Sequence, residues 1–90
     1  MTAPAVTVEF YGIPRARAGR SKLTVRAATV GDALAAVVAA APQLAGLCLP
    51  DGRMAPQYVL SLDGQRFLTD PAERLRPGDR LLLLSADAGG

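Results

Sequence analysis

Several residue types on which enzymes and metal sites depend are missing or scarce in this 90-residue chain. It contains no histidine and a single cysteine, Cys48. One cysteine excludes an intramolecular disulfide, and the common zinc-ligand patterns need histidine or several cysteines. The chain also lacks a glycine-rich phosphate-binding motif. We therefore expect no resident metal or cofactor and no catalytic side chains.

A long hydrophobic run is absent as well. No apolar stretch approaches the ~20 residues that span a bilayer, and the first residues lack the basic-then-apolar order of a secretion signal. Because a chain with one cysteine suits a reducing compartment, we expect a cytoplasmic protein without a membrane partner.

Aromatic side chains are scarce, whereas basic side chains gather in one segment. The only aromatic residues are Phe10, Tyr11, Tyr58 and Phe67. Five of the ten basic residues fall between positions 15 and 26, namely Arg15, Arg17, Arg20, Lys22 and Arg26, although the net charge is only +2. A solvated hairpin loop explains this cluster more simply than nucleic-acid binding, for which too few aromatic rings are available to stack on bases. An acidic protein partner would use the same charges.

The residues that are present suit one small packed domain. Half of them are hydrophobic and 20% are charged, which is typical of a folded chain. Ninety residues cannot hold two hydrophobic cores, so we expect residues 1–90 to form a single domain.

Sequence periodicity predicts five strands and one helix. Alternating or continuous apolar patterns predict strands at residues 6–11, 22–26, 58–62, 66–68 and 80–85, with a hairpin loop at 15–19 and a turn at Asp63-Gly64. Apolar residues from Val30 to Ala41 recur at helical spacing, with Thr29 as the expected N-cap and Pro42 as the stop. The order predicts an α+β fold, in which one helix packs on one face of a mixed sheet of four to five strands.

The segment at residues 43–57 has no clear periodicity and contains several breakers. We expect Leu44, Leu47 and Leu49 to pack beneath it. Without a neighbouring histidine, Cys48 is more simply a packing residue than a reactive thiol.

Four consecutive leucines, residues 81–84, predict that the last strand is central in the sheet. A single helix covers only one face of a sheet, so alternate leucines, Leu82 and Leu84, should reach the other face. An exposed apolar patch of this kind commonly contacts a partner, or a second copy of the same chain.

The sequence then closes on Gly89 and Gly90, and we expect residues 86–90 to form a flexible tail. Five extended residues reach roughly 17 Å. Glycine has no β-carbon, so such a tail is able to enter a narrow channel. A frayed end without function is the simpler interpretation.

Taken together, these features resemble the MoaD/ThiS sulfur-carrier proteins, which have a ubiquitin-like β-grasp fold. The resemblance extends from about Val6 to Gly90. It rests on Phe10-Tyr11-Gly12, Ala18-Gly19, the helix start at residues 29–34, Asp63-Gly64, the segment 75–81 and Gly89-Gly90. One departure is that Ser85-Ala86-Asp87-Ala88 stands where MoaD-like tails often carry Pro-Pro.

The resemblance implies a carrier protein rather than an enzyme, although such a carrier also serves as the small subunit of a molybdopterin synthase. A MoeB- or ThiF-like enzyme would adenylate the carboxylate of Gly90, and a sulfur-transfer enzyme would then convert it to a thiocarboxylate. The implied client is an enzyme such as the large subunit of molybdopterin synthase. Activation is needed because an ionised carboxylate is a poor electrophile.

The expected site therefore combines a reactive end with docking residues. Gly90, with Gly89, supplies the reactive group. Docking is expected from Leu82, Leu84, Arg66, Arg80, Ala86, Asp87 and Ala88. Molybdopterin biosynthesis is the expected pathway, while cysteine biosynthesis, thiamine biosynthesis and tRNA thiolation remain open. A ubiquitin-like modifier joined to lysines, and a binding module with an idle tail, also remain open.

Overall fold

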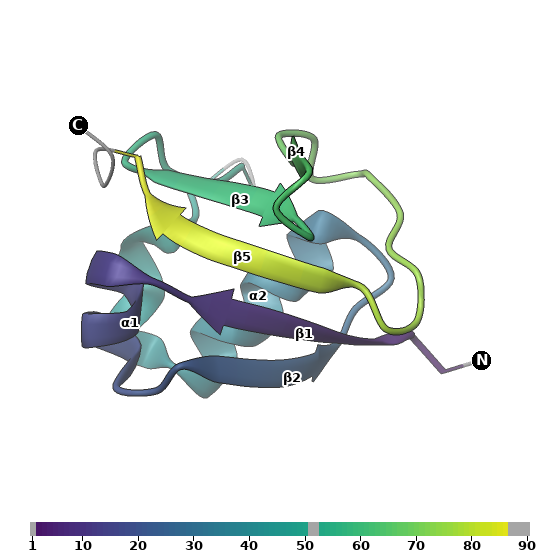
Figure 1. Cartoon of the computed structure of the whole chain (residues 1–90), viewed down its shortest axis with the longest axis horizontal. Coiled ribbons are helices and arrows are strands. Elements are labelled where there is room, and N and C mark those ends of the chain that lie inside the picture. The colour runs from purple at the N-terminus through teal and green to yellow at the C-terminus, as the bar shows by residue number, and fades with distance from the viewer. Residues whose placement is uncertain (1, 51–52, 87–90) are drawn as a thin grey trace.

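The computed structural model describes residues 2–50 and 53–86 and contains one mixed sheet (Figure 1). Its strand order is β2-β1-β5-β3-β4. The strands are β1 (Ala5–Phe10), β2 (Lys22–Arg26), β3 (Tyr58–Leu62), β4 (Arg66–Phe67) and β5 (Arg80–Ser85). The helices are α1 (Gly12–Ala18), α2 (Val30–Ala40) and the 3-10 helix η1 (Pro42–Leu47). In Figure 1, α2 lies behind the sheet and α1 lies at one end of it.

Strand β5 is the central strand, as the leucine run predicts. It pairs parallel with β1 and antiparallel with β3, and β1 pairs antiparallel with β2. Leu81 and Leu83 are completely buried, whereas Leu82 and Leu84 are half-buried. Because successive side chains of a strand point to opposite faces, one pair of leucines belongs to the core and the other pair to the open face.

The core lies between the sheet and α2. It contains Val6, Val8, Phe10, Leu60, Leu81 and Leu83 from the strands, and Val30, Ala33, Leu34 and Val37 from the helix. Thr29 caps α2 as predicted, since its Oγ1 accepts a hydrogen bond from the backbone N–H of Asp32 at 3.1 Å. The helix ends just before Pro42, as the sequence predicts.

The segment after β1 differs from the sequence-based prediction, which placed a loop there. Residues Gly12–Ala18 form helix α1, and Gly19 closes it with a φ of 72° and a hydrogen bond from its N–H to the carbonyl of Arg15 at 3.0 Å. Only Pro14 and Ala18 are buried, four residues apart on one side of the helix. Two buried positions are too few for periodicity to reveal a helix among arginines. The rest of the predicted α+β, β-grasp architecture is confirmed.

Two further details correct or refine the predictions. Leu44 and Leu47 are fully buried in η1, but Leu49, which follows η1 and whose N–H donates to the carbonyl of Arg53, is 39% exposed, so the prediction that it packs beneath the segment is wrong. Cys48 is half-buried, and burial raises the pKa of its thiol, which agrees with a packing role. Within the described ranges, no helix is long and apolar enough to cross a membrane.

Candidate functional site

The face of the sheet opposite α2 carries an apolar patch. On β5, Leu82 and Leu84 lie on this face, and the β3–β5 register places Val59 beside Leu84 and Ser61 beside Leu82. Phe67 of β4 is in turn the register partner of Ser61 and is 69% exposed. We call Val59, Phe67, Leu82 and Leu84 the open-face patch. Exposed apolar area of this kind is typical of a protein-binding surface.

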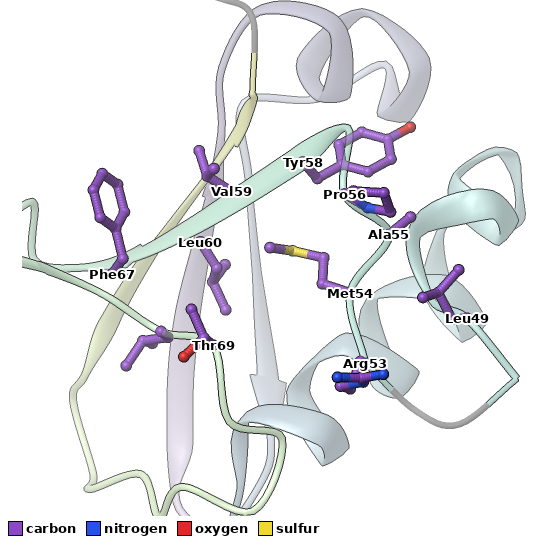
Figure 2. Close-up of a pocket in the computed structure, with 11 residues that line it drawn as sticks. Leu49, Arg53, Met54, Ala55, Pro56, Tyr58, Val59, Leu60, Phe67 and Thr69 are labelled. Carbon is purple, nitrogen blue, oxygen red and sulfur yellow. The ribbon is translucent and has the colours of Figure 1, made fainter.

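An apolar groove continues this patch around the β3–β4 edge (Figure 2). Its volume is about 470 Å³, and Val59 and Phe67 belong to both the groove and the patch. Figure 2 shows the side chain of Met54 pointing toward β3, with Leu49 on the far side of the 53–56 segment. Sequence reasoning did not find the groove, because it joins segments that are distant in the chain. The available signal was Phe67, an aromatic residue in the short strand predicted at residues 66–68.

Arg80 occupies the same face at the start of β5, between two carboxylates. Its Nε lies 3.7 Å from Oε2 of Glu9 and 3.7 Å from Oδ1 of Asp63. Glu9 also accepts a hydrogen bond of 2.6 Å from the hydroxyl of Tyr11, and this bond, which holds the phenol proton, raises the pKa of Tyr11. The patch therefore has a charged border on its β1 side.

Arg66 is not brought to the open-face patch. Its register partner is Leu62, which packs against the core. Nη1 and Nη2 of its guanidinium donate to the two carboxylate oxygens of Glu73, with Nη1 3.2 Å from Oε1. This hydrogen bond lowers the pKa of Glu73 and raises the pKa of Arg66. Of the four predicted docking residues in the strands, Leu82, Leu84 and Arg80 thus share a face and Arg66 does not.

The base of the predicted tail is anchored beside β3. Ser85 is buried opposite Tyr58, and the N–H of the exposed Ala86 donates to the carbonyl of Gln57 at 2.7 Å. The remaining predicted tail residues, Asp87, Ala88, Gly89 and Gly90, lie outside the described residues. Strand β5 therefore carries the chain from the centre of the sheet to the start of the tail.

Helix α1 lies at this same end of the molecule (Figure 1). The N–H of Tyr11, which precedes the helix, donates to the carbonyl of Leu83 at 3.0 Å. Nη1 of Arg17 donates to the hydroxyl of Tyr58 at 2.7 Å. The helix is thus bonded to β3, and the residue before it is bonded to β5. The sequence-based prediction of a loop did not reveal this helix beside the base of the tail.

The described surfaces are suited to binding. Across residues 2–50 and 53–86, no group of three His, Cys, Asp or Glu side chains is placed to hold a metal ion. The features that stand out are the open-face patch, the groove beside it and the start of the tail, all of which are built from or around β3 and β5.

The topology defines the class of protein. A five-stranded sheet in the order β2-β1-β5-β3-β4, with parallel β1 and β5 at its centre and a helix between β2 and β3, is a ubiquitin-like β-grasp fold.

Comparison with solved structures supports this assignment. SAMP1 from Haloferax volcanii is 28% identical, with a TM-score of 0.81 over 96% of this chain and 99% of that chain. A putative molybdopterin converting factor, subunit 1, from Pyrococcus furiosus is 16% identical, with a TM-score of 0.75 over 92% of this chain and 98% of that one. A chain of the BexX/CysO complex of Amycolatopsis orientalis is 20% identical, with a TM-score of 0.77 over 94% and 99%.

No family model and no curated protein sequence matches the chain. The solved structures that it resembles include small archaeal modifier proteins and a putative molybdopterin converting factor subunit, so the resemblance predicted from the sequence is confirmed. The two structures described above at less than 25% identity show the fold alone. The likeness to SAMP1 extends to the sequence over nearly the whole length of both chains.

Proposed function

We propose that this chain is a sulfur carrier whose carboxylate at Gly90 is adenylated and then converted to a thiocarboxylate, which donates sulfur in molybdopterin biosynthesis. The observation that carries the proposal is the path of β5. This central strand of a β-grasp body leads through Ala86 directly to a segment that closes on Gly89-Gly90. The resemblance of the sequence to MoaD-type carriers over residues 6–90 supports the same function.

The chemistry needs no side chain of the carrier. An oxygen of the Gly90 carboxylate attacks the α-phosphorus of ATP in the adenylating enzyme, and pyrophosphate leaves. A persulfide on a sulfur-transfer enzyme then attacks the acyl carbon, and AMP leaves. A thiol attacks the enzyme's sulfur in the resulting acyl disulfide, which releases the thiocarboxylate and leaves a disulfide on the sulfur-transfer enzyme. Glycine at both final positions keeps the reacting end narrow enough for two successive active sites.

Docking is assigned to the open-face patch, with Arg80 on its border. Interfaces commonly combine an apolar centre with arginine and a polar rim. A MoeB- or ThiF-like enzyme that covers Leu82 and Leu84 lies beside Ala86 and so meets the tail. The client that receives the sulfur would use the same face in turn. Arg66 is left out of this docking surface, because it does not share the face of Leu82 and Leu84 and its guanidinium is bonded to Glu73.

Exchange of labelled pyrophosphate into ATP tests the first step. The chain is incubated with ATP and a MoeB- or ThiF-like adenylating enzyme, alongside a variant that lacks Gly90. We expect exchange with the full chain and none with the shortened variant, while both give the same circular dichroism spectrum. Equal exchange with the two chains would contradict the proposal, as would no exchange by an enzyme that is active on another carrier.

A second candidate is a ubiquitin-like modifier, which the likeness to the small archaeal modifier protein favours. The same activated carboxylate would then be transferred to lysine amines of other proteins. Adducts of higher mass that disappear when Gly90 is deleted would identify this function. The same thiocarboxylate would also serve other sulfur-receiving clients, including those of cysteine, thiamine or thiolated-tRNA biosynthesis.

A further inference from the structure

The fold separates the basic cluster of the sequence into two groups. Arg15 and Arg17 lie in α1, Arg20 follows the helix, and Lys22 begins β2, all at the end where the tail starts (Figure 1). Arg26 lies at the opposite end of β2, where its register partner is Ala5 and its Nη1 donates to the carbonyl of Ala3 at 3.1 Å. We call Arg15, Arg17, Arg20 and Lys22 the tail-end cations.

The tail-end cations are exposed and are not neutralised by the body of the protein. Among the described residues, the ion pairs join Arg66 to Glu73 and Arg80 to Glu9 and Asp63, and none involves these four side chains. Glu9, the register partner of Lys22, instead accepts from Tyr11. Four like charges at one end of a small domain repel one another. An anionic partner would relieve this repulsion.

Two of the tail-end cations line a common hollow. Arg15 and Arg20 border a space of about 570 Å³ between α1 and the turn that follows it, together with Gly12, Ala16, Gly19 and Ser21. Arginine side chains bind carboxylates through two parallel hydrogen bonds, and small residues leave room for such a group to enter. The hollow therefore suits an aspartate or glutamate side chain of another protein.

The surroundings favour an acidic protein over a nucleic acid. Ile13 and Tyr11 are 47% and 40% exposed beside these arginines, and arginine with tyrosine and aliphatic side chains is the usual composition of a protein interface. The hydroxyl of Tyr11 is bonded to the carboxylate of Glu9, which places negative charge next to the ring on which a base would have to stack.

We propose that the tail-end cations form a second docking surface, which binds an acidic patch on the adenylating enzyme beside the channel that receives the tail. This inference rests on the proposed function. Because Arg17 is bonded to Tyr58, the register partner of Ser85, α1 has a fixed position relative to the base of the tail. An enzyme that takes Gly90 must approach this end, and opposite charge there accelerates productive encounter.

The test compares two charge-reversed double variants. Arg15→Glu with Arg20→Glu alters the tail-end cations, while Arg26→Glu with Arg76→Glu makes the same change at the opposite end, where Gly78 is bonded to Ala5. Each replacement changes the charge by two, so both variants go from +2 to −2. The Michaelis constant and turnover for the carrier are measured by pyrophosphate exchange at about 50 and 200 mM salt.

We expect the tail-end variant to raise the Michaelis constant about tenfold at low salt, with turnover unchanged and a smaller difference at high salt. The control variant should change the Michaelis constant less than about twofold. Arg15→Gln with Arg20→Gln, which replaces the reversed variant if charge reversal perturbs folding, should give an intermediate rise. If the two reversed variants raise the Michaelis constant equally, the effect comes from net charge and not from the position of the cations, and the inference is wrong.

Binding of a fluorescent oligouridylate tests the alternative that the tail-end cations bind nucleic acid. If the wild-type chain binds this RNA, the tail-end variant does not, and the Michaelis constants stay equal, the surface is a nucleic-acid site and the inference is wrong. If the wild-type chain supports no exchange at all, the proposed function fails and this inference fails with it.

Discussion

At the scale of single residues, Leu82 and Leu83 are neighbours in the chain but lie on opposite faces of β5. Leu83 is completely buried between the sheet and α2, so Leu83→Ala should lower the free energy of unfolding by about 2–5 kcal/mol. Leu82 is half-buried on the open face, and Leu82→Ala should cost only about 1 kcal/mol. Urea titration of both variants measures the difference. Equal losses of stability would show that the open face is packed as tightly as the core.

The ion pair between Arg66 and Glu73 predicts a pH dependence. The hydrogen bond from Arg66 lowers the pKa of Glu73 below its ordinary value of 4.5. A carboxyl group whose pKa is lowered by folding stabilises the fold above the unfolded pKa, and this contribution is lost as pH falls through the folded pKa. The wild-type chain should therefore exceed Glu73→Gln in stability at about pH 7 and lose this advantage by about pH 2.

The measurement for this prediction is the urea midpoint of both chains across that pH range. The same Glu73→Gln change in an Arg66→Gln background is the control, because it removes the partner that causes the pKa shift. An advantage that persists unchanged into acid, or that also appears in the control background, would contradict the assignment.

At the scale of elements, helix α1 depends on a backbone conformation at its end. Gly19 has a φ of 72°, which strains any residue with a β-carbon, although no atom lies within 4 Å of the place such a carbon would occupy. Gly19→Ala should therefore lower the free energy of unfolding by about 1 kcal/mol for conformational reasons alone. Gly46→Ala is the matched control, since that position also has open space but no positive φ. Thermal or urea denaturation showing equal effects would contradict this account.

Some strands and turns could be predicted from the sequence, whereas helix α1 could not. The predicted bounds of β2, β3 and β5 agree with the structure because alternation and the leucine run are local signals. The Asp63-Gly64 turn followed from residue type alone, and both residues have the positive φ that this turn requires. Helix α1 escaped because seven residues with two buried side chains carry too little periodicity.

The candidate site was only partly predictable for a similar reason. Alternation along β5 was enough to place Leu82 and Leu84 on the open face. The contribution of Val59 and Phe67 depends on how β3 and β4 pair with their neighbours, and the separation of Arg26 from Arg15 depends on the register of β1 with β2. These are relations between distant segments, which composition and spacing do not contain.

At the scale of the whole molecule, the proposed function gives strand β5 and the predicted tail different roles. Strand β5 is the central strand of the sheet, and Ala86, which follows it, donates its N–H to the carbonyl of Gln57 beside β3. The proposed function makes the body a docking platform and Gly90 the reacting group. Changes to the open-face patch should therefore weaken binding to partner enzymes, whereas changes to Gly90 should prevent the chemistry.

The most direct measurement is the mass of the C-terminal peptide after reaction. The chain is incubated with ATP, a sulfur source and its adenylating enzyme, and trypsin then cleaves after Arg80, the last basic residue, to release residues 81–90. The account predicts a mass increase in this peptide equal to one oxygen replaced by sulfur. An unchanged peptide, from a reaction in which the same enzyme modifies another carrier, would contradict it.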